Sequence, residues 1–144
     1  MPSIGEQILV RAQLALAGAT SAGTNVFRSR EIGLTRGQAP AIVIVPKDEP
    51  STRMGQFTDK SELDVEFQIF SRGDPWDSLA DAVYVPVHAV VTTDAALLAL
   101  CTDVRRIQRR FEGQEADLTA GTLTVTYRFT FLTAATDVSV GPKP

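Results

Sequence analysis

The sequence predicts an α+β protein in which two or three helices pack on one face of a mostly antiparallel sheet, with a long hairpin between strands. Residues 62–71 and 121–136 alternate apolar and polar side chains, as strands with one buried face do. Residues 3–18 and 73–91 carry apolar side chains at helical spacing. With 144 residues, the chain is long enough for one domain with its own core.

The first third of the chain predicts one helix followed by two short strands. Ser3 and Glu6 have the spacing of a capping box, which marks the start of the helix. Residues 25–30, NVFRSR, predict a short strand, and the glycine-rich residues 31–40 predict a loop. Residues 41–45, AIVIV, are β-branched and apolar between two prolines, which indicates a buried strand.

Residues 46–61, PKDEPSTRMGQFTDKS, are the most polar stretch inside the domain and show no helical period. We expect a long hairpin loop here, poorly ordered in the free protein. In the strand that follows, one set of alternating side chains should enter the core and the other should face away. The first set is Leu63, Val65, Phe67 and Ile69, and the second is Asp64, Glu66 and Gln68.

The second helix should have Asp74 as its N-cap and Pro75 at its first position, where a missing N–H costs little. Pro86 is expected to bend or interrupt this helix. Asp94 is expected to cap a short third helix. The apolar stripe of the second helix is Leu79, Val83, Val87 and Val90.

Two strands should complete the sheet. Residues 103–113, DVRRIQRRFEG, predict a strand with imperfect alternation, and residues 114–121 predict a loop. The last strand, within residues 121–136, should bury Leu123, Val125, Tyr127, Phe129 and Phe131, and its other face should carry Thr122, Thr124, Thr126, Arg128 and Thr130. Residues 1–136 are then one domain, and residues 137–144 a flexible tail.

Composition argues against several classes of protein. The net charge of −3 does not suit a polycation that coats nucleic acid. Cys101 is the single cysteine, and the chain opens without a basic-then-apolar signal pattern, so we expect folding in the cytosol without a disulfide framework. No apolar run approaches the roughly 20 residues that a membrane helix requires.

Residues suited to catalysis or metal binding are few. A Cys–His pair of His88 and Cys101 is conceivable, but neither residue lies in a nucleophile motif, and a helix histidine and a core thiol are the favoured interpretation. Asp77 and Asp81 share a helix face and could hold a cation, although such pairs are more often solvated. No cluster of cysteine and histidine has the spacing of metal ligands, so no metal site is predicted.

The segment RRIQRR is the one dense basic patch. On a regular strand, Arg105 and Arg109 share one face, while Arg106 and Arg110 share the other. These charges could contact phosphates or pair with carboxylates of a neighbouring strand or subunit. Beyond Phe111 no aromatic residue interleaves with them, so acidic protein partners are favoured over nucleic acid. Together with the missing active site, this indicates an interaction protein.

The order of these segments over residues 4–134 resembles the tail terminator (minor tail protein) family of long-tailed bacteriophages. The segments that carry the resemblance are IGEQILVRAQLALAG, NVFRSR, APAIVIVPKDEP, SELDVEFQIFSRGDP, DPWDSLADAV, VTTDAALLAL and LTVTYRFTFLT. The internal Pro86 and the tail TDVSVGPKP have no counterpart in the family pattern.

The resemblance implies a ring-forming structural protein, typically a hexamer, on the last ring of the tail tube. Such a ring ends tube polymerisation and offers the surface to which the head, or a connector or stopper protein, attaches. Viral DNA passes through its lumen without sequence-specific contacts. No catalysis and no cofactor are expected, and the protein should occur in the host cytoplasm during assembly and at the head-proximal end of the virion tail.

A ring requires a surface on each copy that meets a different surface on the next. We expect the hairpin and the arginine-bearing strands to supply subunit or tube contacts, with Arg128→Glu disturbing assembly more than folding. The expected contact residues are Arg53, Met54, Gln56, Phe57, Lys60, Arg105, Arg109 and Arg128. Two alternatives stay open: another neck component, such as a head–tail connector or stopper, or a small enzyme that uses His88, Cys101 or the aspartate pair.

Overall fold

The computed structural model describes residues 1–29, 39–114 and 117–142, and the predicted α+β fold is confirmed. Three helices and six strands are found in the described residues. They are α1 (Ile4–Leu16), β1 (Val26–Arg28), β2 (Ala41–Pro46), β3 (Ser51–Arg53), β4 (Thr58–Arg72), α2 (Trp76–Thr93), α3 (Ala95–Leu98), β5 (Asp103–Gln114) and β6 (Asp117–Ala134). Most of the predicted loop at residues 31–40 lies outside the described residues.

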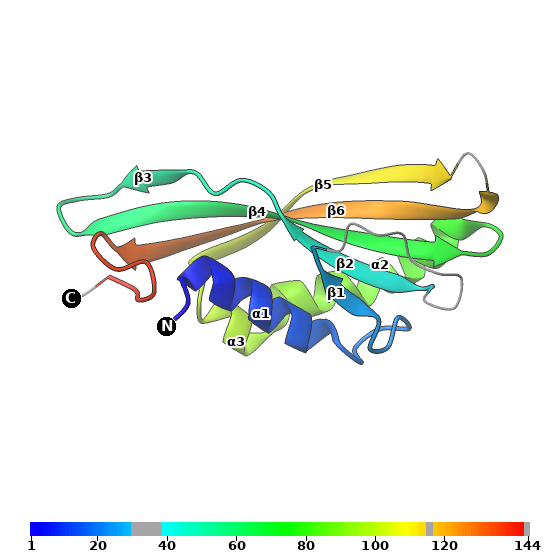
Figure 1. The fold of residues 1–144 in the computed structure, drawn as a ribbon, viewed down its shortest axis with the longest axis horizontal. Helices are drawn as coiled ribbons and strands as arrows, with labels where there is room; N and C mark the ends of the chain where they lie inside the picture. Colours follow the sequence, from blue (N-terminus) through cyan, green and yellow to red (C-terminus); the bar gives the residue numbers. More distant parts are fainter. Residues whose placement is uncertain (30–38, 115–116, 143–144) are drawn as a thin grey trace.

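The sheet is built around the long antiparallel pair of β4 and β6, and the helices lie on one of its faces (Figure 1). The strand order is β1-β2-β4-β6-β5, and β3 pairs with β4 farther along the same strand. The β1–β2 pair is parallel, and the other pairs are antiparallel. The sheet is strongly twisted, and the end that carries β3 extends beyond the helices.

The core lies between the helices and the odd-numbered side chains of the two central strands. Phe67 of β4 and Tyr127 of β6 are fully buried and meet edge to face, with ring centroids 5.5 Å apart. Ile8 of α1 and Val83 and Val87 of α2 close the core from the other side. The alternation predicted for both strands is confirmed, because the pleat sends every second side chain toward the helices.

At the start of α1, one of the two hydrogen bonds of the predicted capping box is present. The Ser3 hydroxyl accepts a hydrogen bond from the Glu6 N–H at 3.2 Å. The Glu6 carboxylate instead accepts two hydrogen bonds from the Arg28 guanidinium, at 2.9 and 2.8 Å. This pair ties α1 to β1 and lowers the pKa of Glu6, because a bidentate cation is a stronger donor than a neutral amide.

The predicted interruption of α2 at Pro86 is wrong, since the helix runs unbroken from Trp76 to Thr93. Proline removes the N–H that would bond the Ala82 carbonyl, and Ala82 is exposed, so water can satisfy that acceptor. The N-cap is Pro75 rather than Asp74. The buried stripe is also rotated from the predicted one: Leu79 is exposed, and the buried residues are Ala80, Val83, Tyr84, Val87 and Val91.

A β-bulge in β5 overturns the predicted arrangement of the arginines. Arg106 pairs with Tyr127 and Gln108 with Thr126, so Ile107 is an extra residue on β5. Because the bulge shifts the alternation by one residue, Arg106 and Arg109 lie on the helix side of the sheet. Arg105 and the fourth arginine, Arg110, lie on the opposite face.

Two predicted loops contain strand residues. Within residues 46–61, Ser51–Arg53 pairs with the start of β4, so only residues 54–57 form the turn. Residues 114–121 were predicted to be a loop, but β6 begins at Asp117. Polar composition concealed β3, because all three of its residues are exposed and need not be apolar.

The segment after β6 returns to the N-terminal helix. The Val138 carbonyl accepts from the Ile4 N–H at 2.8 Å, and the Val140 carbonyl accepts from the Ala134 N–H at 3.1 Å. The Gln7 side chain donates to the Ser139 carbonyl at 3.2 Å. Residues 138–140 are thus hydrogen-bonded to α1 and β6, whereas the predicted flexibility of residues 137–144 in solution stays a prediction.

Trp76 covers two glycines on neighbouring strands, which makes a matched pair for testing the packing. A Cβ added to Gly121 would lie 2.5 Å from the indole ring, whereas one added to Gly113 would lie 3.7 Å away. We expect Gly121→Ala to lower the free energy of unfolding by about 1–3 kcal/mol, because the ring must move. Gly113→Ala should be neutral or slightly stabilising. Urea unfolding of both variants measures this, and equal effects would contradict the packing described here.

Candidate interaction surfaces

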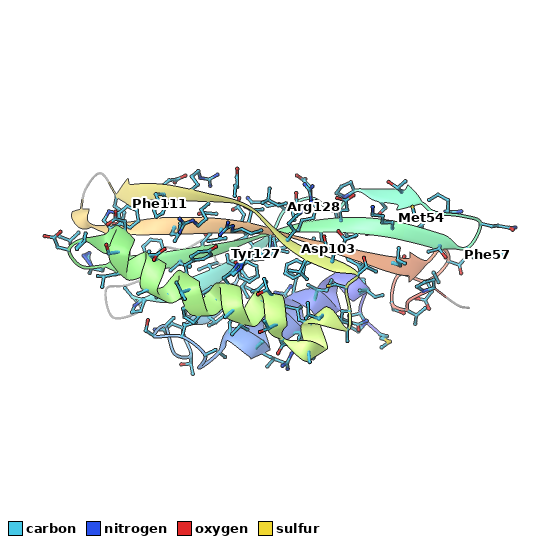
Figure 2. All side chains as sticks on the ribbon, turned by 180° about the vertical axis from the view of Figure 1, so that it is seen from behind. Met54, Phe57, Asp103, Phe111, Tyr127 and Arg128 are labelled. Carbon is cyan, nitrogen blue, oxygen red and sulfur yellow. The ribbon has the colours of Figure 1, made fainter. Side chains whose placement is uncertain are left out.

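The β3–β4 hairpin forms an arm that ends in two exposed apolar side chains. Met54 and Phe57 flank the turn, with 56% and 69% of their surfaces exposed. Figure 2 shows both at the far end of the molecule, away from the core around Tyr127. The turn is fixed by two hydrogen bonds of 2.8 Å, from the Met54 N–H to the Thr58 carbonyl and from the Ala135 N–H to the Phe57 carbonyl. The poor order expected of the free hairpin stays a prediction.

The polar residues of this arm divide into paired and unpaired groups. Arg53 binds the Asp59 carboxylate across the hairpin, and it also donates to the Gln56 carbonyl at 3.4 Å. Lys60 has no ion-pair partner among the described residues and is partly exposed. Of the contact residues predicted here, Gln56 and Lys60 keep their side chains available, while Arg53 is engaged within the chain.

The outer face of the sheet, opposite the helices, carries a central ion pair. Arg128 donates to both carboxylate oxygens of Asp64, at 2.9 and 3.2 Å, and lies 3.6 Å from Glu62. This bond raises the pKa of Arg128, which therefore stays charged. Arg105 faces Arg128 on the adjacent strand and is exposed without an ion-pair partner in the described part of the chain.

Arg128→Glu should disturb folding as well as assembly, which changes the expectation from sequence. The new carboxylate would lie beside Asp64 and Glu62, where like charges repel. Arg105→Glu is the matched control, because it would give Arg128 an acidic cross-strand neighbour. We expect thermal unfolding to show a lower Tm for Arg128→Glu and an unchanged or higher Tm for Arg105→Glu. Identical Tm values would contradict the structural role of the pair.

The helix side of β5 uses its arginines within the chain. Arg109 binds Asp81 of α2 at 3.0 Å and lies over the Tyr84 ring, 4.9 Å from its centroid. Arg106 donates to the Tyr84 hydroxyl. Arg109 therefore joins a strand to a helix, and its predicted contact with another subunit is not needed to explain its position. Asp77 and Asp81, the two aspartates considered for a cation, both have partners within the chain. Asp81 forms the ion pair with Arg109, and Asp77 accepts a hydrogen bond from the Ser78 N–H.

His88 and Cys101 have separate environments and do not bond to each other. His88 Nδ1 lies 2.6 Å from the buried Tyr127 hydroxyl. Cys101 is largely buried, and this burial, with the nearby charge of Asp103, raises the pKa of its thiol to about 12. A thiol with such a pKa stays protonated at neutral pH and is a poor nucleophile. Among the described residues, no group of histidine, cysteine and carboxylates could hold a metal ion.

We expect the double variant His88→Ala, Cys101→Ala to retain assembly with a modest loss of stability. Removing the imidazole takes the His88 partner from the buried Tyr127 hydroxyl, at a cost of roughly 1–3 kcal/mol. Urea unfolding measures this loss, and an assay of virion formation measures function. A folded variant that had lost its function entirely would favour the enzyme alternative.

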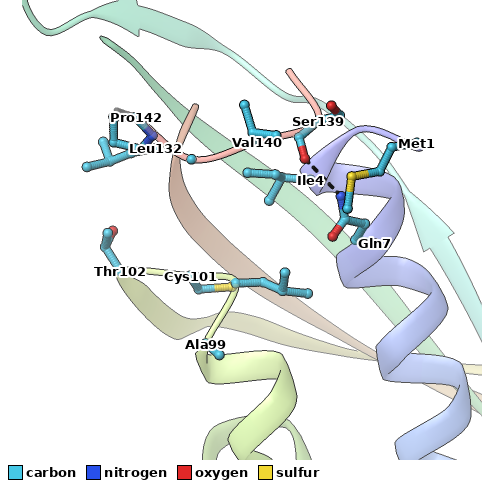
Figure 3. Close-up of a pocket in the computed structure, with 12 residues that line it drawn as sticks. Met1, Ile4, Gln7, Ala99, Cys101, Thr102, Leu132, Ser139, Val140 and Pro142 are labelled. Carbon is cyan, nitrogen blue, oxygen red and sulfur yellow. Dashed lines mark hydrogen bonds between the residues drawn. The ribbon is translucent and has the colours of Figure 1, made fainter. Parts of the chain in front are cut away.

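An apolar hollow between α1, α3 and the C-terminal segment was not predicted from the sequence. It has two adjoining parts of about 420 and 290 Å³, which share Gln7 and Leu100 and which we call the α1–α3 trough. Figure 3 shows the larger part, bounded by Ile4, Cys101 and Val140. The smaller part is lined by Pro2, Gln7, Val10, Arg11, Leu14, Ala96 and Leu100.

The sequence carries a signal for this trough. Val10 and Leu14 lie four residues apart on α1, off the buried stripe, and are 42% and 64% exposed. Beside them, Arg11 donates to both Asp94 carboxylate oxygens at 2.8 Å, which fixes α1 against α3. Asp94 also accepts from the Leu97 N–H, so its predicted capping role is confirmed. The walls of the trough are thus held in place by an ion pair and a helix cap.

Comparison with known proteins gives a likeness of fold. No protein-family model matches the chain, and no curated protein matches it in sequence. A chain from a solved structure described as the virion of a native gene transfer agent particle matches with a TM-score of 0.55 and 13% sequence identity, over 90% of this chain and 92% of that chain. In the described residues, no helix is long and apolar enough to cross a membrane. The chain therefore has a fold that also occurs in the virion of a gene transfer agent particle.

Proposed function

We propose that this chain is a structural protein of a phage-like virion rather than an enzyme. The observation that carries the proposal is the likeness of fold, over nine tenths of the chain, to a protein of a gene transfer agent virion. The separate environments of His88 and Cys101 support it, because no nucleophile is paired with a base there. The two exposed apolar surfaces, the hairpin tip and the α1–α3 trough, also suit a protein that acts by assembling.

Within the virion, we propose that copies of the chain form a hexameric ring, as the resemblance to tail terminators implies, at the head-proximal end of the tail tube. The ring ends polymerisation of the tube protein and offers a surface to the head or to its connector or stopper. DNA passes through its lumen. The order of the sequence segments, which resembles that of the tail terminator family, supports this more specific role.

Deletion of the gene tests this role through the length of the tails. A terminator that is absent should leave tubes that grow past their normal length and carry no heads, and purified protein should restore joining. Electron micrographs of lysates measure both. Tubes of normal length that lack heads would favour a connector or stopper instead, and normal virions would contradict a structural role in the neck.

A further inference from the structure

We propose that the free edge of β5 in one copy binds an acidic edge of the sheet in a second copy. The acidic edge is the stretch of residues 47–50, between β2 and β3. The contact joins two cations, Arg105 and Arg106, to two carboxylates, Asp48 and Glu49. This inference rests on the proposed ring, and it names the two surfaces that meet when copies assemble.

β5 is a long strand with one open side. It lies at the end of the strand order, and among the described residues it pairs with β6 alone (Figure 2). It spans 12 residues, and every side chain except that of Val104 is exposed. A long exposed edge presents N–H and C=O groups on which another chain can pair.

Two arginines of β5 lack a carboxylate partner among the described residues. Arg105 faces Arg128 on the adjacent strand, where like charges repel. Arg106 donates to a neutral tyrosine hydroxyl of α2, and its guanidinium has enough N–H groups to bind a carboxylate as well. The other two arginines of β5 already bind carboxylates of their own chain. Carboxylates from another copy would therefore find two cations available on this edge.

The acidic edge is held extended along β4. The Lys47 N–H donates to the Asp64 carbonyl at 2.8 Å, and the Asp64 N–H donates to the Asp48 carbonyl at 2.9 Å. No described strand pairs with the other side of this stretch. Pro46 and Pro50 lack an N–H, which hinders indiscriminate strand pairing here. The side chains of the acidic edge therefore decide which surface it binds.

The two carboxylates of the acidic edge have no cation partner among the described residues. Asp48 and Glu49 are both exposed, and the neighbouring Lys47 is paired with a carboxylate of β4 instead. Glu49 lies over the start of α1, since a Cβ added to Gly5 would be 2.5 Å from its Oε1. This partial burial raises the pKa of Glu49, and no described cation lowers it again. A cation from another copy would stabilise the charged form.

The two edges carry their charges on corresponding faces of the sheet. Lys47 lies on the outer face, 3.7 Å from its carboxylate partner, whereas Glu49 lies on the helix side. Regular alternation would put both on one face, so Asp48 is the extra residue of a bulge. On β5, Arg106 lies on the helix side and therefore meets Glu49 when the sheet continues into the next copy. Arg105, on the outer face, has a side chain long enough to reach Asp48.

The contact has to form between copies, because β4 and β6 separate β5 from the acidic edge within one chain. Three strand spacings amount to roughly 14 Å, which is too far for an ion pair. Two copies of β5 match each other poorly, since each strand has an excess of arginines over carboxylates. The contact therefore joins two different surfaces and repeats from copy to copy, as a ring requires.

Zero-length crosslinking tests this contact directly. An Arg105→Lys variant labelled with ¹⁵N is mixed with the unlabelled parent protein, with and without isolated tail tubes, and treated with a carbodiimide that joins amines to carboxylates in contact. We expect mixed peptides that link position 105 to Asp48 or Glu49. The matched control is Arg110→Lys, because Arg110 lies on the same face of β5 but binds Glu112 of its own chain. Its yield of mixed peptides should be at least about tenfold lower, since docking raises the local concentration only at position 105.

Charge reversal gives a second, independent measurement. Arg105→Glu should weaken association of the copies by at least about tenfold in sedimentation velocity, although its Tm is unchanged or higher. Adding Asp48→Arg should restore association, because the cation and the carboxylate have exchanged places. Adding Asp77→Arg instead gives the same net charge on an exposed residue of α2 and should restore nothing.

Equal yields of mixed peptides for the two lysine variants, or equal association of the two double variants, would overturn the contact. If the protein still corrects tail length in that case, the proposed function stands and only this contact fails. If the crosslink and the rescue are found but tail length is unaffected by deletion, the contact stands and the proposed function fails.

Discussion

Phe57→Ser is expected to weaken binding of the protein to tail tubes or to its own copies by at least about tenfold, while the free energy of unfolding changes by less than about 0.5 kcal/mol. The side chain is 69% exposed and contributes little to the core, so its removal barely affects folding. In a docked interface the same side chain would be buried. Loss of the Phe57 side chain should therefore lower the binding affinity and leave the free energy of unfolding almost unchanged.

Val85→Ser is the control for this variant. Val85 has a similar exposed fraction, 61%, but lies on α2 and away from both the tip and the trough. Sedimentation velocity with and without tail tubes measures association, and urea unfolding measures stability. If Phe57→Ser and Val85→Ser bind tubes equally well, the hairpin tip is not a contact surface.

Tyr127→Ala is expected to lower the free energy of unfolding by about 3–5 kcal/mol, a large part of the roughly 5–15 kcal/mol typical of a domain. The Tyr127 side chain is fully buried, packs edge to face on Phe67 and bonds His88 through its hydroxyl. The truncation leaves a cavity at the centre of the β4–β6 pair and also removes the partner of His88. Chemical unfolding followed by circular dichroism measures the change.

Tyr127→Phe separates packing from hydrogen bonding. It keeps the ring against Phe67 and removes only the hydroxyl, so its cost should stay near 1–3 kcal/mol, set by the unpaired His88 nitrogen. A loss below about 1 kcal/mol for Tyr127→Ala would show that the core is not centred on this side chain.

The parts of the fold that could be predicted were those in which one local pattern decides the outcome. Alternation placed Phe67 and Tyr127 on the buried face, because a strand can satisfy that pattern in only one register. The role of Asp94 as a helix cap was also predictable, since capping depends on residues a few positions apart. Each of these depends on neighbours along the chain.

The features that could not be predicted depend on contacts between residues distant in sequence. The bulge at Ile107 is set by the pairing of β5 with β6, and it placed Arg109 on the face of Arg106 and Arg110 on the face of Arg105, the reverse of the predicted grouping. Nothing near Arg128 in the sequence shows that Asp64, on another strand, will bind it. Likewise, the trough arises where α1, α3 and the end of the chain meet, and a helix pattern shows only that Val10 and Leu14 lie off the buried stripe.

Electron cryomicroscopy of isolated tails and isolated heads tests the proposed role most directly. The account predicts a ring of this fold at the head-proximal end of detached tails. Isolated heads without tails should lack the protein. A ring found on such heads and absent from tails, or tails that carry no copy of the chain, would contradict it.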